Sequence, residues 1–167
     1  DNRFLWRMPR RRLNLESYRD AILTVTGALE TSLGGPSIDP QDPAANRRTV
    51  YSKVSRLDLN PMLARFDFPD PNAHSPSRHD TTTPLQKLFL LNSPFLVEHS
   101  ANLAKRIRAS AGSNRERIKL AYEVLFGRQP QDQELQLAMD FVADGSETRW
   151  NGFAQALLIS NEMFILD

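Results

Sequence analysis

Cysteine is absent from all 167 residues of the chain. This absence excludes disulfide bonds, thiolate metal sites, a cysteine nucleophile and covalently attached haem c from these residues. Glycine is scarce, with seven residues, and the chain contains no Gly-rich phosphate loop, no G-x-S-x-G turn and no H-E-x-x-H metal motif. We therefore expect no cofactor bound to this part of the chain.

Long apolar runs are also missing, and none approaches the roughly 18 residues that a membrane helix needs. The formal net charge is only +1, from 21 basic and 20 acidic residues, so overall charge gives no reason to expect a nucleic-acid partner. One cluster, Arg10-Arg11-Arg12 beside Trp6, has the character of a phosphate-binding patch. Glu16 and Asp20 follow it closely enough to neutralise it. We expect neither a membrane span nor a nucleic-acid partner.

Much of the sequence carries local signals for the start and the end of helices. An apolar stripe at spacings of three and four predicts a helix over residues 15–33, with Asn14 as its N-cap and Gly34-Gly35-Pro36 as its stop. Two capping boxes, Thr83 to Gln86 and Ser113 to Glu116, predict the starts of two further helices. The helices expected after residue 83 cover about 84–91, 94–111, 114–126, 131–143 and 149–160.

Residues 36–82 differ from the rest, because they hold seven of the eleven prolines and no glycine. Proline fixes its own φ and restricts the residue before it, so this region reads as an ordered, extended crossing segment. Residues 49–54 form its only strand-like run. The apolar tail, residues 163–166, is expected to dock on the core.

The expected fold class is therefore mainly α, a compact bundle of five to six helices with a Pro-rich extended crossing segment and at most one short strand pair. We expect a single helical domain over residues 1–167, divided into a basic lead-in (1–13), the Pro-rich ordered region (36–82) and a helical bundle (83–167). Because the chain begins with Asp1 instead of Met, we expect it to be part of a longer, multidomain chain.

The polar side chains of the central loop are the candidate site residues. Asp67, Asp70 and Asn72 place three oxygen-bearing side chains close together, which suits Ca²⁺, although the spacing matches no EF-hand. Asp67 and Asp70 also qualify as an acid and base pair for glycoside hydrolysis, if their separation is suitable. The simpler interpretation is that these residues cap turns between prolines, so the favoured expectation is no metal. Arg78, Asn72 and Arg12 are the candidate ligand-binding residues, and a structural Arg78 would pair with Asp67 or Asp70.

Three histidines complete the list of candidates. His74 and His79 lie in the same loop, and with Asp80 they form a conceivable Zn or Fe ligand set. No helix carries two histidines four residues apart, so surface positions are the favoured interpretation for the loop pair. His99 falls inside a predicted helix, where we expect it to be hydrogen-bonded or half-exposed.

Four blocks, in order along the chain, resemble the planctomycete-specific domain family PSD-one, a domain of unknown function. The blocks are Arg11–Leu13 with Glu16–Leu23; Gly34-Gly35-Pro36; Phe66–Asn72 through Arg78 and Thr82–Gln86 to Leu91-Asn92; and Tyr122 to Gly127–Pro130 with Ala156–Glu162. The resemblance implies the C-terminal part of a large exported protein, periplasmic or on the cell surface. It also implies an upstream haem-c domain in many relatives and a genetic setting among sulfatases and polysaccharide-degrading enzymes.

These observations leave three functional hypotheses. The first is a non-catalytic helical module, either a scaffold or a module that binds a ligand or partner, centred on residues 66–92. Its partners would be neighbouring domains of the parent protein or a glycan. The second is an enzyme domain acting on acidic or sulfated polysaccharide, with Asp67 and Asp70 as its carboxylates. The third is a structural domain stabilised by Ca²⁺.

Overall fold

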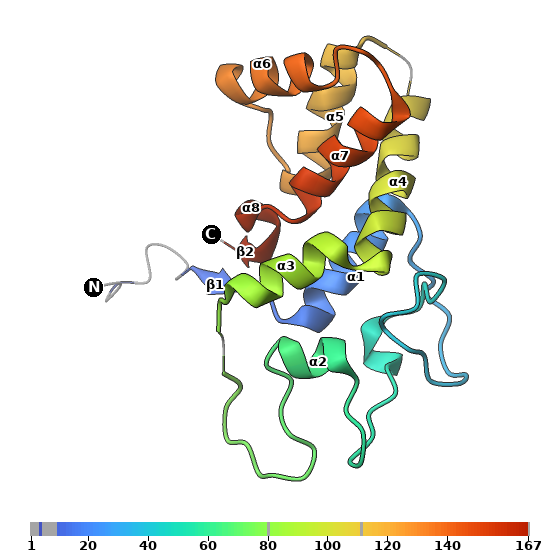
Figure 1. The fold of residues 1–167 in the computed structure, drawn as a ribbon, viewed down its shortest axis with the longest axis vertical. Helices are drawn as coiled ribbons and strands as arrows, with labels where there is room; N and C mark the ends of the chain where they lie inside the picture. Colours follow the sequence, from blue (N-terminus) through green and yellow to red (C-terminus); the bar gives the residue numbers. More distant parts are fainter. Residues whose placement is uncertain (1–3, 5–9, 80, 111, 167) are drawn as a thin grey trace.

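The computed structural model of the protein describes residue 4 and residues 10–79, 81–110 and 112–166. Trp6, Asp80 and most of the basic lead-in lie outside the described residues. Over the described residues the chain forms eight α-helices, one 3₁₀ helix and one pair of two-residue strands (Figure 1). In chain order these are β1 (Arg11–Arg12), α1 (Leu15–Thr26), η1 (Thr49–Tyr51), α2 (Pro61–Arg65), α3 (Pro84–Asn92), α4 (Pro94–Ala109), α5 (Asn114–Phe126), α6 (Asp132–Phe141), α7 (Glu147–Leu158), α8 (Asn161–Phe164) and β2 (Ile165–Leu166). The predicted mainly α class is confirmed; the two shortest helices, α2 and α8, were not predicted.

The longest helix, α4, is the centre of the arrangement and packs against α1, α3, α5 and α7. Helices α5, α6 and α7 form one end of the molecule, whereas α2 and the loops of the crossing segment form the other (Figure 1). A single cluster of buried apolar side chains, which includes Leu15, Phe95, Leu103 and Trp150, runs through both halves. Most of the site residues predicted from the sequence lie in the loop after α2, whereas Arg12 lies in β1.

The helix starts follow from local capping chemistry. Thr83 and Ser113 each accept a hydrogen bond from the backbone N–H three residues later, and the side chains of Gln86 and Glu116 reach back to the N–H of the capping residue. Both predicted capping boxes are therefore confirmed. Asn14 caps α1 as predicted, because its side-chain oxygen accepts from the N–H of Ser17 at 2.8 Å.

Helix α1 is shorter than predicted. It ends at Thr26, and Gly27 follows in the left-handed conformation with φ of 75°. The Gly27 N–H closes the helix on carbonyl oxygens of its last turn, which is the usual role of glycine at this position. Beyond this stop Leu29 still packs against the core, whereas Leu33 is 91% exposed.

The predicted strand over residues 49–54 is also wrong. Thr49–Tyr51 forms a 3₁₀ turn, and only isolated bridges, such as Ile38 with Ser52, occur nearby. The cause lies in α1, where the carboxylate of Asp20 accepts hydrogen bonds from the Thr49 N–H (2.7 Å) and hydroxyl (2.6 Å). These bonds fix the start of a helical turn at Thr49, and the segment pairs with Ile38 only through an isolated bridge at Ser52.

Arg19 of α1 is fully buried and ties the crossing segment to the helices. Its guanidinium donates to the carbonyl oxygens of Pro40 (3.0 Å) and Arg47 (3.0 Å), to the carbonyl of Ala45 and to the hydroxyl of Thr49 (3.1 Å). The same group lies 4.7 Å from the ring centroid of Phe95. One side chain thus satisfies several backbone oxygens in a region that has little regular secondary structure.

The two ends of the described chain meet in a short antiparallel ribbon. Arg11 pairs with Leu166 and Arg12 with Ile165, and the N–H of Leu13 donates to the carbonyl of Phe164 at 2.8 Å. Phe164 is buried, with its ring centroid 4.2 Å from that of Tyr18. The predicted docking of the tail on the core is confirmed for Met163 and Phe164, whereas Ile165 and Leu166 are exposed. The ribbon brings Arg12 next to the central loop.

None of the helices in the described ranges combines the length and the apolar character needed to cross a bilayer.

Candidate functional site

Asp67 lies at the centre of the predicted site, immediately after α2. It has φ of 61°, a left-handed conformation that aspartate tolerates better than most residues. Its carboxylate accepts from the Thr81 N–H (2.9 Å) and hydroxyl (2.8 Å), and Arg12 lies 3.5 Å away. Burial by itself raises the pKa of Asp67, but the hydrogen bonds from Thr81, the charge of Arg12 and the amide of Gln86 outweigh it and lower the pKa. The side chain is therefore held ionised.

Gln86 connects three parts of this region. As the third residue of the α3 capping box, it accepts from the Thr83 N–H at 3.1 Å. Its amide nitrogen donates to the carbonyl of Arg65 at the end of α2 (2.9 Å) and to the Thr81 hydroxyl (3.2 Å). Only 4% of Gln86 is exposed, so its role is to join α2, the loop and α3.

Arg78 closes the loop onto α1. Its Nε donates to the backbone carbonyl of Asp67 (3.0 Å), and its Nη1 donates to the carboxylate of Glu16 (2.9 Å). The predicted carboxylate partner, Asp67 or Asp70, is therefore wrong: the partner is Glu16 on a helix more than sixty residues earlier. Sequence alone did not predict this pair because it depends on how the loop folds back over α1. We call Glu16, Asp67, Arg78, Thr81 and Gln86 the polar clasp.

Asp70 and Asn72 lie outside the polar clasp, in a separate turn. The Asp70 carboxylate accepts from the Asn72 N–H at 2.8 Å, and the Asn72 side chain donates to the carbonyl of Arg56 at 2.8 Å. These are the contacts of a capped turn. The three residues proposed as a cation or acid–base site therefore take part in two separate sets of hydrogen bonds. Asp67 bonds to Thr81, whereas Asp70 and Asn72 stabilise the next turn.

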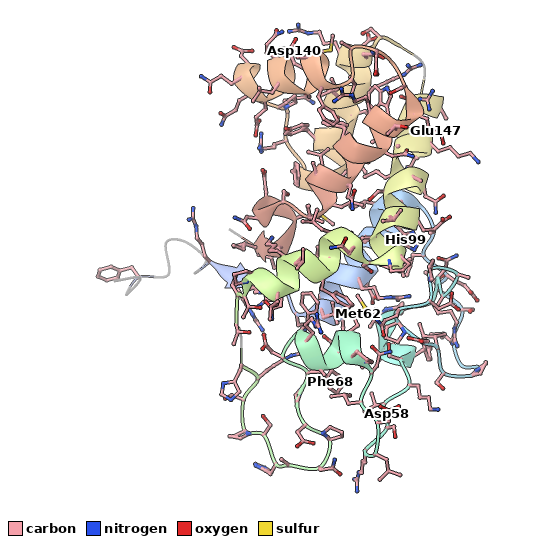
Figure 2. The ribbon with its side chains drawn as sticks, viewed as in Figure 1. Asp58, Met62, Phe68, His99, Asp140 and Glu147 are labelled. Carbon is pink, nitrogen blue, oxygen red and sulfur yellow. The ribbon has the colours of Figure 1, made fainter. Side chains whose placement is uncertain are left out.

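The other predicted ligand-binding residues lie closer together. Arg12 and Arg78 line one surface hollow, together with Arg11 and Ser17, at the start of α1. Asn72 does not line it. Phe68, in the loop after α2 (Figure 2), packs near Arg78, with its ring centroid 5.4 Å from the guanidinium.

Within the described ranges, no group of three or more His, Cys, Asp or Glu side chains is placed to hold a metal ion. His74 and His79 are exposed, and Asp80, their proposed partner, is outside those ranges. His99 differs from expectation: it is 1% exposed, and neither ring nitrogen has a hydrogen-bond partner among the described residues. Burial, with a smaller effect from the charge of Arg19, lowers the pKa of His99 to about 4. It packs on Phe95, with ring centroids 4.3 Å apart, in α4 (Figure 2).

The sequence interpretation did not single out Arg19, and it did not predict that His99 is buried without a hydrogen-bond partner among the described residues. Arg19 and His99 both lie on the buried faces of their helices, at the same spacings as the apolar residues around them. A charged or polar residue within an apolar stripe is a signal for a buried polar contact, and this signal was available. The partners of Arg19 could not be predicted from the sequence, because they are mostly backbone oxygens of an irregular segment.

These features define a small, mainly α domain whose loops are fixed by side-chain contacts to backbone. A family model described as PSD1, a protein of unknown function (DUF1553), matches residues 1–142. The chain therefore belongs to the PSD1 family, and the resemblance inferred from the sequence blocks is confirmed. Comparisons with curated proteins and with solved structures find no match.

Proposed function

We propose that this PSD1 domain is a non-catalytic helical module that acts as a scaffold within an exported multidomain protein. The observation that supports this proposal best is the polar clasp. The most distinctive block of the sequence uses its polar side chains on contacts within the domain: Asp67 with Thr81, Arg78 with Glu16, and Gln86 with the carbonyl of Arg65. These contacts fix α1, α2 and α3 relative to one another.

The electrostatics of Asp67 argue against one catalytic role, that of general acid. A general acid in a glycosidase needs a raised pKa, so that it still carries its proton at working pH. The pKa of Asp67 is instead lowered. A carboxylate that is kept ionised by Thr81 and Arg12 is suited to holding a loop in place.

The proposal also includes the cellular location of the parent protein and the partners of this domain. The family resemblance implies export to the periplasm or cell surface, neighbouring domains as the main partners and a glycan as a further candidate. Any haem c would be carried by another part of the parent protein. A rigid module whose loops are fixed by its own side chains suits a position between domains.

The clasp can be tested by stability. We expect Arg78→Met to lower the free energy of unfolding by about 1–2 kcal/mol, because it leaves the Glu16 carboxylate and the Asp67 carbonyl without their donor. Chemical denaturation followed by circular dichroism measures this loss. Arg56→Met, an exposed arginine of the same region, is the matched control and should stay within about 0.5 kcal/mol of the wild type. An unchanged or raised stability of Arg78→Met would instead indicate a functional site, since residues kept for function commonly reduce stability.

A catalytic role is tested separately. The folded domain is incubated with acidic and sulfated polysaccharides, and new reducing ends are measured for the wild type and for Asp67→Asn. We expect no turnover above buffer for either protein. Turnover by the wild type that disappears in a folded Asp67→Asn variant would overturn the non-catalytic proposal.

A further inference from the structure

A polar hollow lies where the second half of α4 meets the first turns of α5 and α7. Its volume is about 590 Å³, within the range of roughly 300–1,000 Å³ that small-molecule sites usually have. Glu147 lines it from the start of α7 (Figure 2). We call it the basic hollow, and its polar lining consists of Asn102, Lys105, Arg108, Arg117, Glu147 and Asn151.

The spacing of residues along α4 explains both the shape and the charge of the basic hollow. Arg108 and Ala109 follow Lys105 by three and four positions, so the three side chains lie on one face of the helix. Ala101, four residues before Lys105, belongs to the same face. Because alanine has only a methyl side chain, the two alanines leave open the space beside the longer cationic side chains.

The charged side chains of the basic hollow are not paired with one another. Three cations and one carboxylate line it, and none of the four forms an ion pair with a residue that the structure describes. Arg117 donates from Nε to the carbonyl of Ser110 at 3.4 Å, which orients its guanidinium. Arg108 and Arg117 are partly buried, whereas Lys105 and Glu147 are exposed. The lining thus carries an excess of two positive charges, and an anion placed among the cations reduces their mutual repulsion.

This excess charge matches one class of anion best. A phosphate monoester carries about −1.5 to −2 charges at pH 7, and arginine pairs with it through two parallel hydrogen bonds. A sulfate ester or a carboxylate carries a single negative charge and balances only half of the excess. The side-chain amides of Asn102 and Asn151 form no hydrogen bond with other described residues, and each can donate to and accept from a hydroxyl group. A ligand that combines a phosphate with hydroxyl groups therefore uses the whole polar lining.

We propose that the basic hollow binds the phosphate monoester of a small sugar. The phosphate group lies among Lys105, Arg108 and Arg117, and the amides of Asn102 and Asn151 hold hydroxyl groups of the sugar. This binding site is additional to the scaffold role and does not depend on it.

Glucose 6-phosphate is the probe, and amide chemical shifts of the ¹⁵N-labelled protein are the measurement, at about pH 7.5 so that the phosphate is a dianion. We expect shifts confined to residues 101–110, 114–118 and 146–151. The expected dissociation constant is on the order of 1 mM, as suits a small ligand at an open site. Because the contact is largely ionic, raising the salt concentration from about 0.02 M to about 0.2 M should weaken binding several-fold.

Three related compounds separate the role of charge from the role of the hydroxyl groups. Glucose has the hydroxyl groups without the charge and should not bind measurably at about 10 mM. Glucose 6-sulfate has the same shape with less negative charge and should bind about fivefold more weakly. Inorganic phosphate keeps the charge without the sugar and should bind about threefold more weakly, because the amides lose their partners.

Variants connect the binding to the basic hollow. Arg108→Gln removes a cation and should weaken binding about tenfold. Glu147→Gln removes the carboxylate of the lining and should strengthen binding about threefold, a gain that damage to the fold cannot produce. Ala109→Glu adds a carboxylate at an exposed position of α4 and should abolish binding. Arg115→Gln, at an exposed position of α5 outside the lining, is the matched control for Arg108→Gln and should bind like the wild type.

Several results would overturn the proposal. Equal binding of glucose and glucose 6-phosphate would remove the role of charge, and equal or tighter binding of glucose 6-sulfate would remove the preference for a dianion. Unchanged binding by a folded Ala109→Glu, or weaker binding by Glu147→Gln, would place the phosphate elsewhere. A short single-stranded DNA that binds at least about tenfold more tightly than the sugar phosphate would indicate a nucleic-acid surface instead. No shift at about tenfold the expected dissociation constant would also reject the proposal.

Discussion

Replacing Arg19 with methionine is expected to lower the free energy of unfolding by about 3–5 kcal/mol, the largest loss that we predict for a single side chain. Methionine fills a similar volume but donates no hydrogen bond. The carbonyl oxygens of Pro40, Ala45 and Arg47 would lose the group that satisfies them. Chemical denaturation measures the loss, and backbone amide exchange over residues 39–52 shows whether the crossing segment detaches first.

Two further variants distinguish this explanation from a general effect of losing an arginine. Arg115→Met, at an exposed position of α5, should change stability by less than about 0.5 kcal/mol. Arg19→Lys should fall between the wild type and Arg19→Met, because it keeps the charge but cannot reproduce the planar set of donors. A stability of Arg19→Met within 1 kcal/mol of the wild type would contradict the role assigned to Arg19 here.

Acidification from pH 7 to pH 5 is expected to lower the free energy of unfolding by about 2 kcal/mol through His99. The whole loss that His99 can cause at still lower pH is about 3 kcal/mol. The pKa of His99 is about 4 in the folded protein and near 6.5 when the chain is unfolded. Between these values the unfolded chain binds a proton that the folded chain does not. Stability from His99 is therefore complete above pH 6.5 and is lost as the pH falls towards 4.

Denaturation curves at several pH values, for the wild type and two variants, test this prediction. His99→Gln cannot titrate in this range, so its stability should change little between pH 7 and pH 5. His79→Gln removes an exposed histidine and should keep the full pH dependence. The carboxyl groups with lowered pKa values, such as Asp67 and Glu134, affect stability mainly below about pH 4.5. Equal pH dependence of His99→Gln and the wild type would contradict the prediction.

The helices that carry their own signals could be predicted from the sequence. Thr83 with Gln86, and Ser113 with Glu116, specify helix starts through contacts within four residues, and the structure contains both. Gly27 is an equally local signal for the end of α1, whereas the apolar stripe beyond it predicts a longer helix than the structure contains. A left-handed cap ends a helix whatever the pattern that follows.

The crossing segment could not be predicted in the same way. Thr49 forms a helical turn because Asp20 caps it from a different element, and Arg78 bonds to Glu16 across 62 positions of the chain. Such contacts depend on the path of the whole loop, and no periodicity in the sequence records that path. The sequence therefore identified Asp67 and Arg78 as candidate site residues, but not their partners Thr81 and Glu16.

The β1–β2 ribbon has a mechanical consequence. Arg11 faces Leu166 in an antiparallel pair, so the outer ends of the two strands lie side by side, about 5 Å apart. Tension applied between these two ends would peel the ribbon open one pair at a time. The force at which the domain begins to yield would be that of two residue pairs and the Leu13–Phe164 hydrogen bond, and the packed helices would carry load only after the ribbon has opened.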